Sequence, residues 1–116
     1  MTQYHEPMEL LDEKTRNITR AINSLKEELE AVDWYNQRVQ ATSDPELKEI
    51  MAHNRDEEIE HACMALEWLR RNMEGWDQEL RTYLFAEGSV LEAETMATDV
   101  GNLGGDEPGL SIGNLK

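Results

Sequence analysis

The pattern of apolar and polar positions predicts a long first helix over residues 8–40. Apolar residues recur there at alternating steps of three and four, which is the spacing of one face of an α-helix. Neither glycine nor proline interrupts the segment. Glu28 breaks the row, because it stands where an apolar residue is expected. The row consists of Ile18, Ala21, Leu25, Val32, Tyr35 and Val39.

A second helix is predicted over residues 45–73, after a short turn. Asp44 or Ser43 is a suitable N-cap, and Pro45 suits the first helical position. Because the connection is short, we expect this helix to lie antiparallel to the first. Two apolar rows indicate two buried faces and therefore a partner chain. They are Leu47, Ile50, Ala65 and Leu69, interrupted by Asn54, Glu58 and His61, and beside them Ile59, Ala62, Leu66 and Met73.

The two helices should bring their polar interruptions to the same height. Glu28 lies 15 residues before Ser43 in the turn, and Glu58 lies 15 residues after it. Glu58 and His61 are separated by one helical turn, so both project from one face. We therefore expect Glu28, Glu58 and His61 to meet across the hairpin.

The rest of the chain divides into a short helix and a glycine-rich tail. A third helix is expected over 77–86, with Asp77 as its cap and with Leu80, Tyr83 and Leu84 buried. Six of the seven glycines lie from Gly88 onward, which favours a flexible tail over 88–116 behind a helical domain over 1–87. Apolar residues at the end of the tail indicate a docking peptide over about 109–116. Residues 100–103 (VGNL) are similar to residues 112–115 (IGNL), either as a second copy of the docking peptide or by chance.

Composition limits the classes of partner and compartment. The net charge is -14, from 25 acidic and 11 basic residues, which argues against nucleic acid and anionic membranes. The one cysteine, Cys63, fits a reducing cytosol, and its place in a helical pattern predicts a small core residue. No apolar run has the length of a membrane span, and no signal peptide is visible. We expect a soluble intracellular protein.

Glu28, Glu58 and His61 indicate a metal site. Buried carboxylates are costly unless they are paired or bound to a cation. Oxygen ligands with one imidazole suit iron or manganese better than a structural zinc site. A di-iron site in a four-helix bundle needs two such sets, so one hairpin supplies half, and we expect a two-fold axis between chains. The alternative is a set of polar residues that are hydrogen-bonded across a dimer interface.

Other polar and aromatic residues can be interpreted as structural residues as well as functional ones. An acidic strip on the first predicted helix, which contains Glu27, Glu30 and Asp33, is either a solvated face or an approach route for cations. Tyr35 is either a hydrogen-bond donor to a site ligand or a core residue. His53 and Glu57 are interpreted as surface residues, and the tryptophans as packing residues. The tryptophans are Trp34, Trp68 and Trp76.

Four segments of the chain resemble the encapsulated ferritins, over about residues 5–88. The C-terminal end, LSIGNLK (110–116), resembles the peptide that directs cargo into encapsulin nanocompartments. The four segments are EELEAVDWY (27–35), HNRDEE (53–58), LEWLRR (66–71) and LRTYLF (80–85).

The resemblance implies a fold, an assembly and an activity. The fold class is all-α, a two-helix hairpin whose dimer rebuilds a ferritin-like four-helix bundle within a ring-shaped decamer. The implied ferroxidase centre comprises Glu28, Glu58 and His61 of both chains, with Tyr35 and Trp34 close by. Glu27 and Glu30 correspond to a second, outer metal site.

The implied chemistry is oxidation of ferrous iron by oxygen or peroxide, with the mineral stored in an encapsulin shell in the bacterial or archaeal cytoplasm. Two other functions remain open from the residues. One is non-redox binding of iron, zinc or calcium, and the other is an adaptor that binds a partner through its apolar faces and tail.

Overall fold

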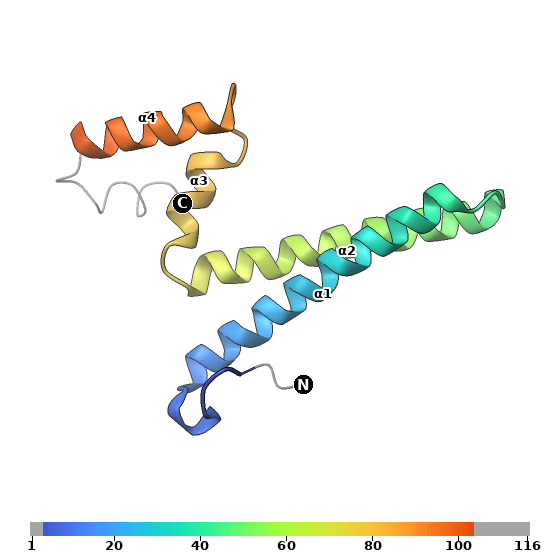
Figure 1. The fold of residues 1–116 in the computed structure, drawn as a ribbon, viewed down its shortest axis with the longest axis horizontal. Helices are drawn as coiled ribbons and strands as arrows, with labels where there is room; N and C mark the ends of the chain where they lie inside the picture. The colour runs from blue at the N-terminus through green and yellow to red at the C-terminus, as the bar shows by residue number, and fades with distance from the viewer. Residues whose placement is uncertain (1–3, 104–116) are drawn as a thin grey trace. The chain divides into compact units, whose positions relative to one another are not determined.

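The computed structural model describes residues 4–103 of the chain, with side chains described for residues 4–98. The chain forms two compact units, Met1–Asn72 and Met73–Lys116. The regular elements of the described residues are all helices (Figure 1), so the predicted all-α class is confirmed. None of these helices combines the length and apolar character needed to span a bilayer.

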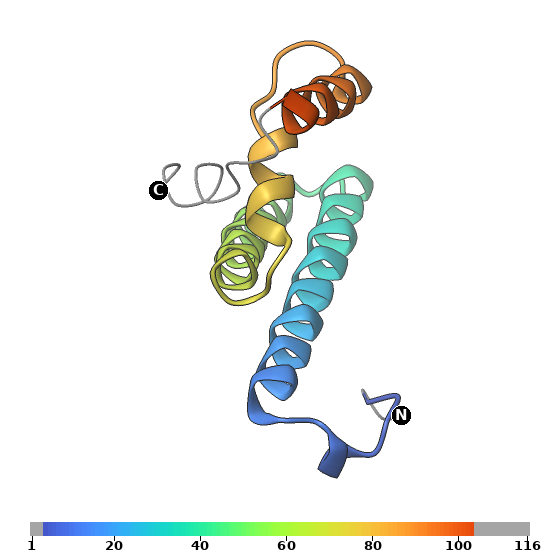
Figure 2. The same cartoon turned by 90° about the vertical axis from the view of Figure 1, so that its left-hand side faces the viewer.

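The first unit is an antiparallel hairpin of α1 (Glu13–Ala41) and α2 (Pro45–Asn72), preceded by a short 3-10 turn, η1 (Met8–Leu10). Figures 1 and 2 show the two long helices side by side, with the turn between them at one end. Asp44 caps α2 by accepting a hydrogen bond from the amide of Leu47 at 2.8 Å. The short turn therefore sets the antiparallel arrangement that the sequence predicted.

The first helix begins later than predicted, at Glu13 instead of residue 8. Leu11 is extended, and the Asp12 side chain accepts a hydrogen bond from the amide of Thr15 at 2.8 Å. An aspartate in this position satisfies an amide that has no partner inside the helix. Residues 12–17 are all polar and the apolar row begins only at Ile18, so the spacing of apolar residues could not locate the start of the helix.

Burial along the hairpin follows the predicted row on α1 more closely than on α2. All of the α1 row, Glu28 included, is half-buried. On α2, Ala62 and Leu69 are the buried apolar residues, whereas Leu47 and Ile50 are 43% and 48% exposed. One chain therefore buries only part of the apolar surface that the helices carry.

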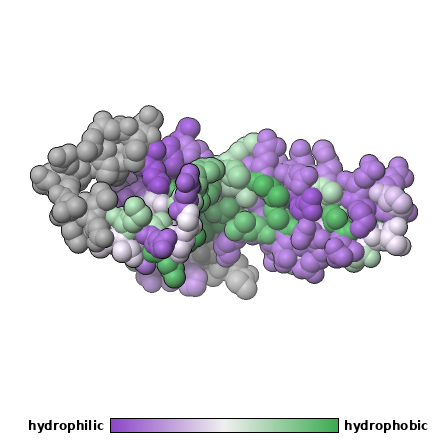
Figure 3. Space-filling view, turned by 90° about the horizontal axis from the view of Figure 1, so that it is seen from above, coloured by the Kyte–Doolittle hydropathy of each residue, from purple (hydrophilic) through white to green (hydrophobic). Residues whose placement is uncertain are grey.

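Several other apolar side chains of the hairpin are exposed. Leu29 is 55% exposed and Met64 58%, and Figure 3 shows green hydrophobic atoms among purple hydrophilic ones along the hairpin. Cys63 is also exposed, so its predicted place in the core is wrong for the single chain. It follows Ala62 on the helix, and a step of one residue turns a side chain away from the buried row.

Two side-chain hydrogen bonds cross from α2 to α1 between the turn and Glu58. Arg55 donates from Nη1 to Oδ1 of Asn36 at 3.0 Å. Lys48 donates from Nζ to the carbonyl oxygen of Val39 at 2.7 Å. These cations therefore link the two helices on the turn side of Glu28 and Glu58.

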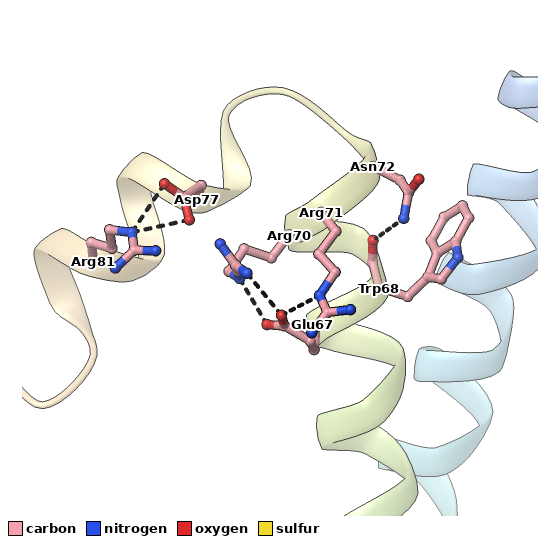
Figure 4. A network of polar contacts seen from close by, with 7 residues as sticks. All are labelled: Glu67, Trp68, Arg70, Arg71, Asn72, Asp77 and Arg81. Carbon is pink, nitrogen blue, oxygen red and sulfur yellow. Dashed lines mark hydrogen bonds and ion pairs between the residues drawn. The ribbon is translucent and has the colours of Figure 1, made fainter. Parts of the chain in front are cut away.

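Glu67, near the C-terminal end of α2, is held by two arginines (Figure 4). Arg70 donates from Nε and Nη2 at 2.7 and 2.8 Å, and Arg71 donates from Nε at 2.6 Å. The hydrogen bonds from Arg70 and then Arg71 lower the pKa of the Glu67 carboxyl to about 2. This carboxylate is fully partnered by its own helix.

In the second unit, α3 (Trp76–Tyr83) begins and ends before the predicted bounds of 77–86. It follows Gly75, whose φ of 101° suits glycine. Asp77 is not its cap. Instead, Asp77 is buried and accepts hydrogen bonds from Nε of Arg81 at 3.0 Å (Figure 4). Leu84, predicted to be buried, is 47% exposed because it follows the end of the helix.

The chain forms a further helix, α4 (Val90–Leu103), where the sequence predicted a flexible tail. The hydroxyl of Ser89 accepts a hydrogen bond from the amide of Leu91 at 3.1 Å. All five glycines after Gly88 lie at position 101 or later, and the segment before them is rich in residues that favour a helix. Residues 100–103 belong to this helix, and the predicted docking peptide over 109–116 lies outside the described residues.

Candidate metal centre

The hairpin brings Glu28 of α1 to Glu58 and His61 of α2. Each residue offers one ligand atom, and these atoms all lie within 4.8 Å of one another. Nδ1 of His61 lies 3.4 Å from Oε1 of Glu58 and 3.6 Å from Oε2 of Glu28. The predicted meeting of the three residues is therefore present in a single chain.

The two carboxylates are half-buried and face each other. The side chain of Glu28 is 22% exposed and that of Glu58 is 26% exposed, whereas His61 is 45% exposed. Burial raises the pKa of the Glu28 carboxyl, and a hydrogen bond with Glu58 and its negative charge raise it further. His61 acts in the opposite direction and Glu27 adds to the increase. The site therefore holds negative charge at a cost that a bound cation would relieve.

The donor set fits ferrous iron. Carboxylate oxygen and neutral imidazole nitrogen are ligands that iron accepts, whereas structural zinc sites favour thiolates. Three ligand atoms also leave coordination positions open for a second set of ligands or for a reactant. The arrangement can therefore bind an iron ion but does not enclose it.

Tyr35 and Trp34 lie further along α1. Tyr35 is half-buried, and the guanidinium of Arg38 lies 5.1 Å from the centre of its ring. Trp34 is 50% exposed and lines a shallow groove with Gln37, Arg38 and Ala41. Neither aromatic residue belongs to the cluster of ligand atoms, so their predicted role near the metal stays a prediction.

The acidic strip on α1 is exposed. Glu27 and Glu30 face solvent, and Asp33 accepts a hydrogen bond from Nε2 of Gln37 at 3.2 Å. His53 and Glu57 are exposed as well, so their interpretation as surface residues is confirmed. Glu27 is nevertheless close enough to affect the charge of Glu28, since it contributes to the raised pKa.

The contact between Arg55 and Asn36 was not predicted from the sequence. Both residues are polar and neither interrupts the predicted apolar rows, so the pattern of burial gave no signal. The position of Arg55, one helical turn before Glu58, was the available clue.

The fold and the site together define a class of protein. A glutamate on one helix faces a Glu-x-x-His pair on its antiparallel neighbour, which is half of the ligand arrangement of di-iron carboxylate four-helix bundles. Residues 3–87 match the EncFtn-like family, and the chain belongs to that family.

Individual relatives agree with this assignment. The chain is 57% identical over 105 residues to a ferritin-like protein of Thermotoga maritima, which covers 90% of this chain and 92% of that protein. It is 55% identical over 121 residues to an encapsulated ferritin-like protein of Rhodospirillum rubrum, over 97% of this chain and 86% of that protein. The resemblance to the encapsulated ferritins is confirmed.

A solved structure has the same fold. The crystal structure of a protein from Nitrosomonas europaea is 58% identical to this chain and superposes with a TM-score of 0.73. The match covers 76% of this chain and 98% of the other chain.

Proposed function

We propose that this protein is a ferroxidase whose di-iron site is completed by a second copy of the chain. Glu28, Glu58 and His61 of each chain supply the ligands. The observation that carries the proposal is the pair of half-buried carboxylates that face one imidazole with their ligand atoms within 4.8 Å. Such a group is unfavourable when empty and suited to a divalent cation.

Each ligand has a distinct task. The carboxylates of Glu28 and Glu58 bind ferrous iron and neutralise its charge. His61 binds through a ring nitrogen in its neutral form. Iron is the substrate: two ferrous ions give one electron each to dioxygen, which takes up two protons and leaves as hydrogen peroxide. With peroxide as the oxidant, the same two electrons and two protons give two water molecules.

The proposed dimer follows from what one hairpin lacks. It offers one glutamate and one Glu-x-x-His pair, whereas a di-iron bundle site uses two of each. Exposed apolar side chains on the hairpin, Leu29 at 55% and Ile59 at 44%, support burial against a second copy. The family resemblance further implies that these dimers form a ring-shaped decamer.

The exposed acidic residues serve the approach of iron in this proposal. Glu27 and Glu30 form an outer site that attracts ferrous ions, and a net charge of -14 increases that attraction. The charge of Glu27 contributes to the raised pKa of Glu28, which supports the placement of Glu27 close to the metal centre. Tyr35 is assigned to the surroundings of the site, as the resemblance implies.

The destination of the oxidised iron is an encapsulin compartment. The relative from Rhodospirillum rubrum is described as encapsulated, and residues 109–116 resemble a cargo peptide. Co-expression with an encapsulin shell tests this step. Removal of residues 109–116 should abolish loading while iron oxidation by the free protein stays the same, and unchanged loading would contradict the assignment.

Stopped-flow absorbance after addition of ferrous salt tests the activity itself. Glu58→Ala and His61→Ala should lose rapid iron oxidation, whereas Glu60→Ala, on the exposed side of α2, should keep it. Oxygen uptake is measured in parallel. A parent protein that binds iron tightly without oxygen uptake is a non-redox metal-binding protein, and one that binds no metal is an adaptor.

A further inference from the structure

At Glu28 and Glu58 the two helices of the hairpin meet through half-buried carboxylates. Glu28 and Glu58 occupy positions where apolar side chains would pack across the hairpin. The buried apolar residues of α2, Ala62 and Leu69, both lie on the side of Glu58 away from the turn. Two facing carboxylates do not interdigitate as apolar side chains do, so contacts beside them matter for the register of the two helices here.

Arg55 supplies a link at the edge of this region. Its Nη1 donates to Oδ1 of Asn36 on the opposite helix at 3.0 Å, and its Nε donates to Oδ1 of Asp56 at 3.1 Å. The Arg55 side chain is 26% exposed. A planar guanidinium with two donors engaged has little freedom to move, so it fixes the position of its acceptor better than a single amine does.

The link lies close to the ligands along the helix. Arg55 precedes Glu58 by three residues, a rise of about 4.5 Å, and both residues lie on one side of α2. A shift of α1 along α2 by one residue would therefore stretch the hydrogen bond to Asn36 and misalign Glu28 at the same time.

We infer that Arg55 is a positioning residue for the metal centre, acting through its hydrogen bond to Asn36. It holds α1 against α2 so that Glu28 faces Glu58 and His61 before iron arrives. The inference rests on the proposed function, because it assigns Arg55 a role in preparing that site. Metal sites bind more tightly when surrounding residues fix the orientation of their ligands.

Four variants of the full chain test this role. Arg55→Gln and Asn36→Ala remove one partner each, and the double variant removes both. Arg20→Gln is the matched control, since Arg20 also donates to an asparagine, Asn17 at 2.6 Å, but within α1. It removes the same charge without affecting a contact between the helices.

Two measurements are made on each variant. Amide hydrogen exchange without metal reports opening of the helices around Glu28 and Glu58. Titration with Co²⁺, followed by its visible absorption, reports the affinity and ligand geometry of the site without any iron oxidation. We expect Arg55→Gln and Asn36→Ala to exchange faster and to bind Co²⁺ about tenfold more weakly. The double variant should show no further loss, because the two residues act through one contact.

The outcomes separate this inference from the proposed function. Parent-like exchange in Arg55→Gln would overturn the inference, and so would faster exchange with unchanged Co²⁺ affinity, which marks a purely structural residue. Losses that add in the double variant, or an equal loss in Arg20→Gln, would also overturn it. A parent protein that binds neither Co²⁺ nor ferrous iron would instead overturn the proposed function, and the role of Arg55 with it.

Discussion

Two glutamates of the hairpin have opposite surroundings. Glu67 is bound by two arginines of its own helix, which lower its pKa to about 2. Glu28 is half-buried opposite Glu58, and burial with that neighbour raises its pKa. The first carboxylate is paired with arginines of its own helix, whereas the second faces another carboxylate and an imidazole. The contrast separates a carboxylate that stabilises the fold from one that a bound cation would stabilise.

The largest expected difference between the two glutamates is in iron oxidation. Glu28→Gln should slow the initial rate by at least about hundredfold, because losing a ligand costs more than losing a residue that orients one. Glu67→Gln should keep the parent rate. Stopped-flow absorbance measures both, with Glu60→Gln as a control. Equal rates in Glu28→Gln and the parent would remove Glu28 from the site.

A smaller effect, of opposite sign, is expected on the stability of the metal-free protein. The pKa of Glu28 lies above its ordinary value in the folded chain, so its contribution to stability is present at acid pH and is lost as pH rises through the folded pKa. At neutral pH, Glu28→Gln should therefore raise the melting temperature of the metal-free protein by a few degrees.

Thermal unfolding with a chelator, followed by circular dichroism, measures this difference. It should shrink as the pH is lowered and the parent carboxyl becomes protonated. Glu60→Gln should melt like the parent throughout. A lower melting temperature for Glu28→Gln at neutral pH would mean that the carboxylate is already satisfied within the chain.

The smallest expected effect is at Glu67. Its folded pKa of about 2 lies below the ordinary value of 4.5, so its contribution is present above pH 4.5 and is lost as pH falls through about 2. Glu67→Gln should lower the melting temperature slightly at neutral pH, and the difference from the parent should vanish at the acid end. The effect is small because exposed ion pairs contribute little.

The sequence predicted the centre of the molecule better than its ends. Equal spacing of Glu28 and Glu58 from the turn was enough to predict their meeting, because a short connection leaves antiparallel helices little choice of register. The break before Glu13 depends on one side-chain cap at Asp12, and residues 12–17 are all polar, so no apolar spacing locates it. The helix α4 was missed because glycines counted over the whole tail lie mostly after it.

Some features of the hairpin depend on contacts that the spacing of apolar residues does not predict. The hydrogen bond between Arg55 and Asn36 joins two polar residues at unrelated positions in the sequence. The exposure of Cys63 follows from its angular position next to the buried Ala62. Such details depend on the rotation of each helix about its axis as well as on residue type.

The short turn after Ala41 has a consequence for how this chain can change through evolution. Glu28 and Glu58 oppose each other only because the number of residues between them is fixed. One inserted residue inside either helix, between the site and the turn, would rotate a ligand by about 100° around the helix axis. Many side chains along that stretch can be exchanged without harm, but its length cannot. Descendants of this gene should therefore differ by substitution there and hardly ever by insertion or deletion.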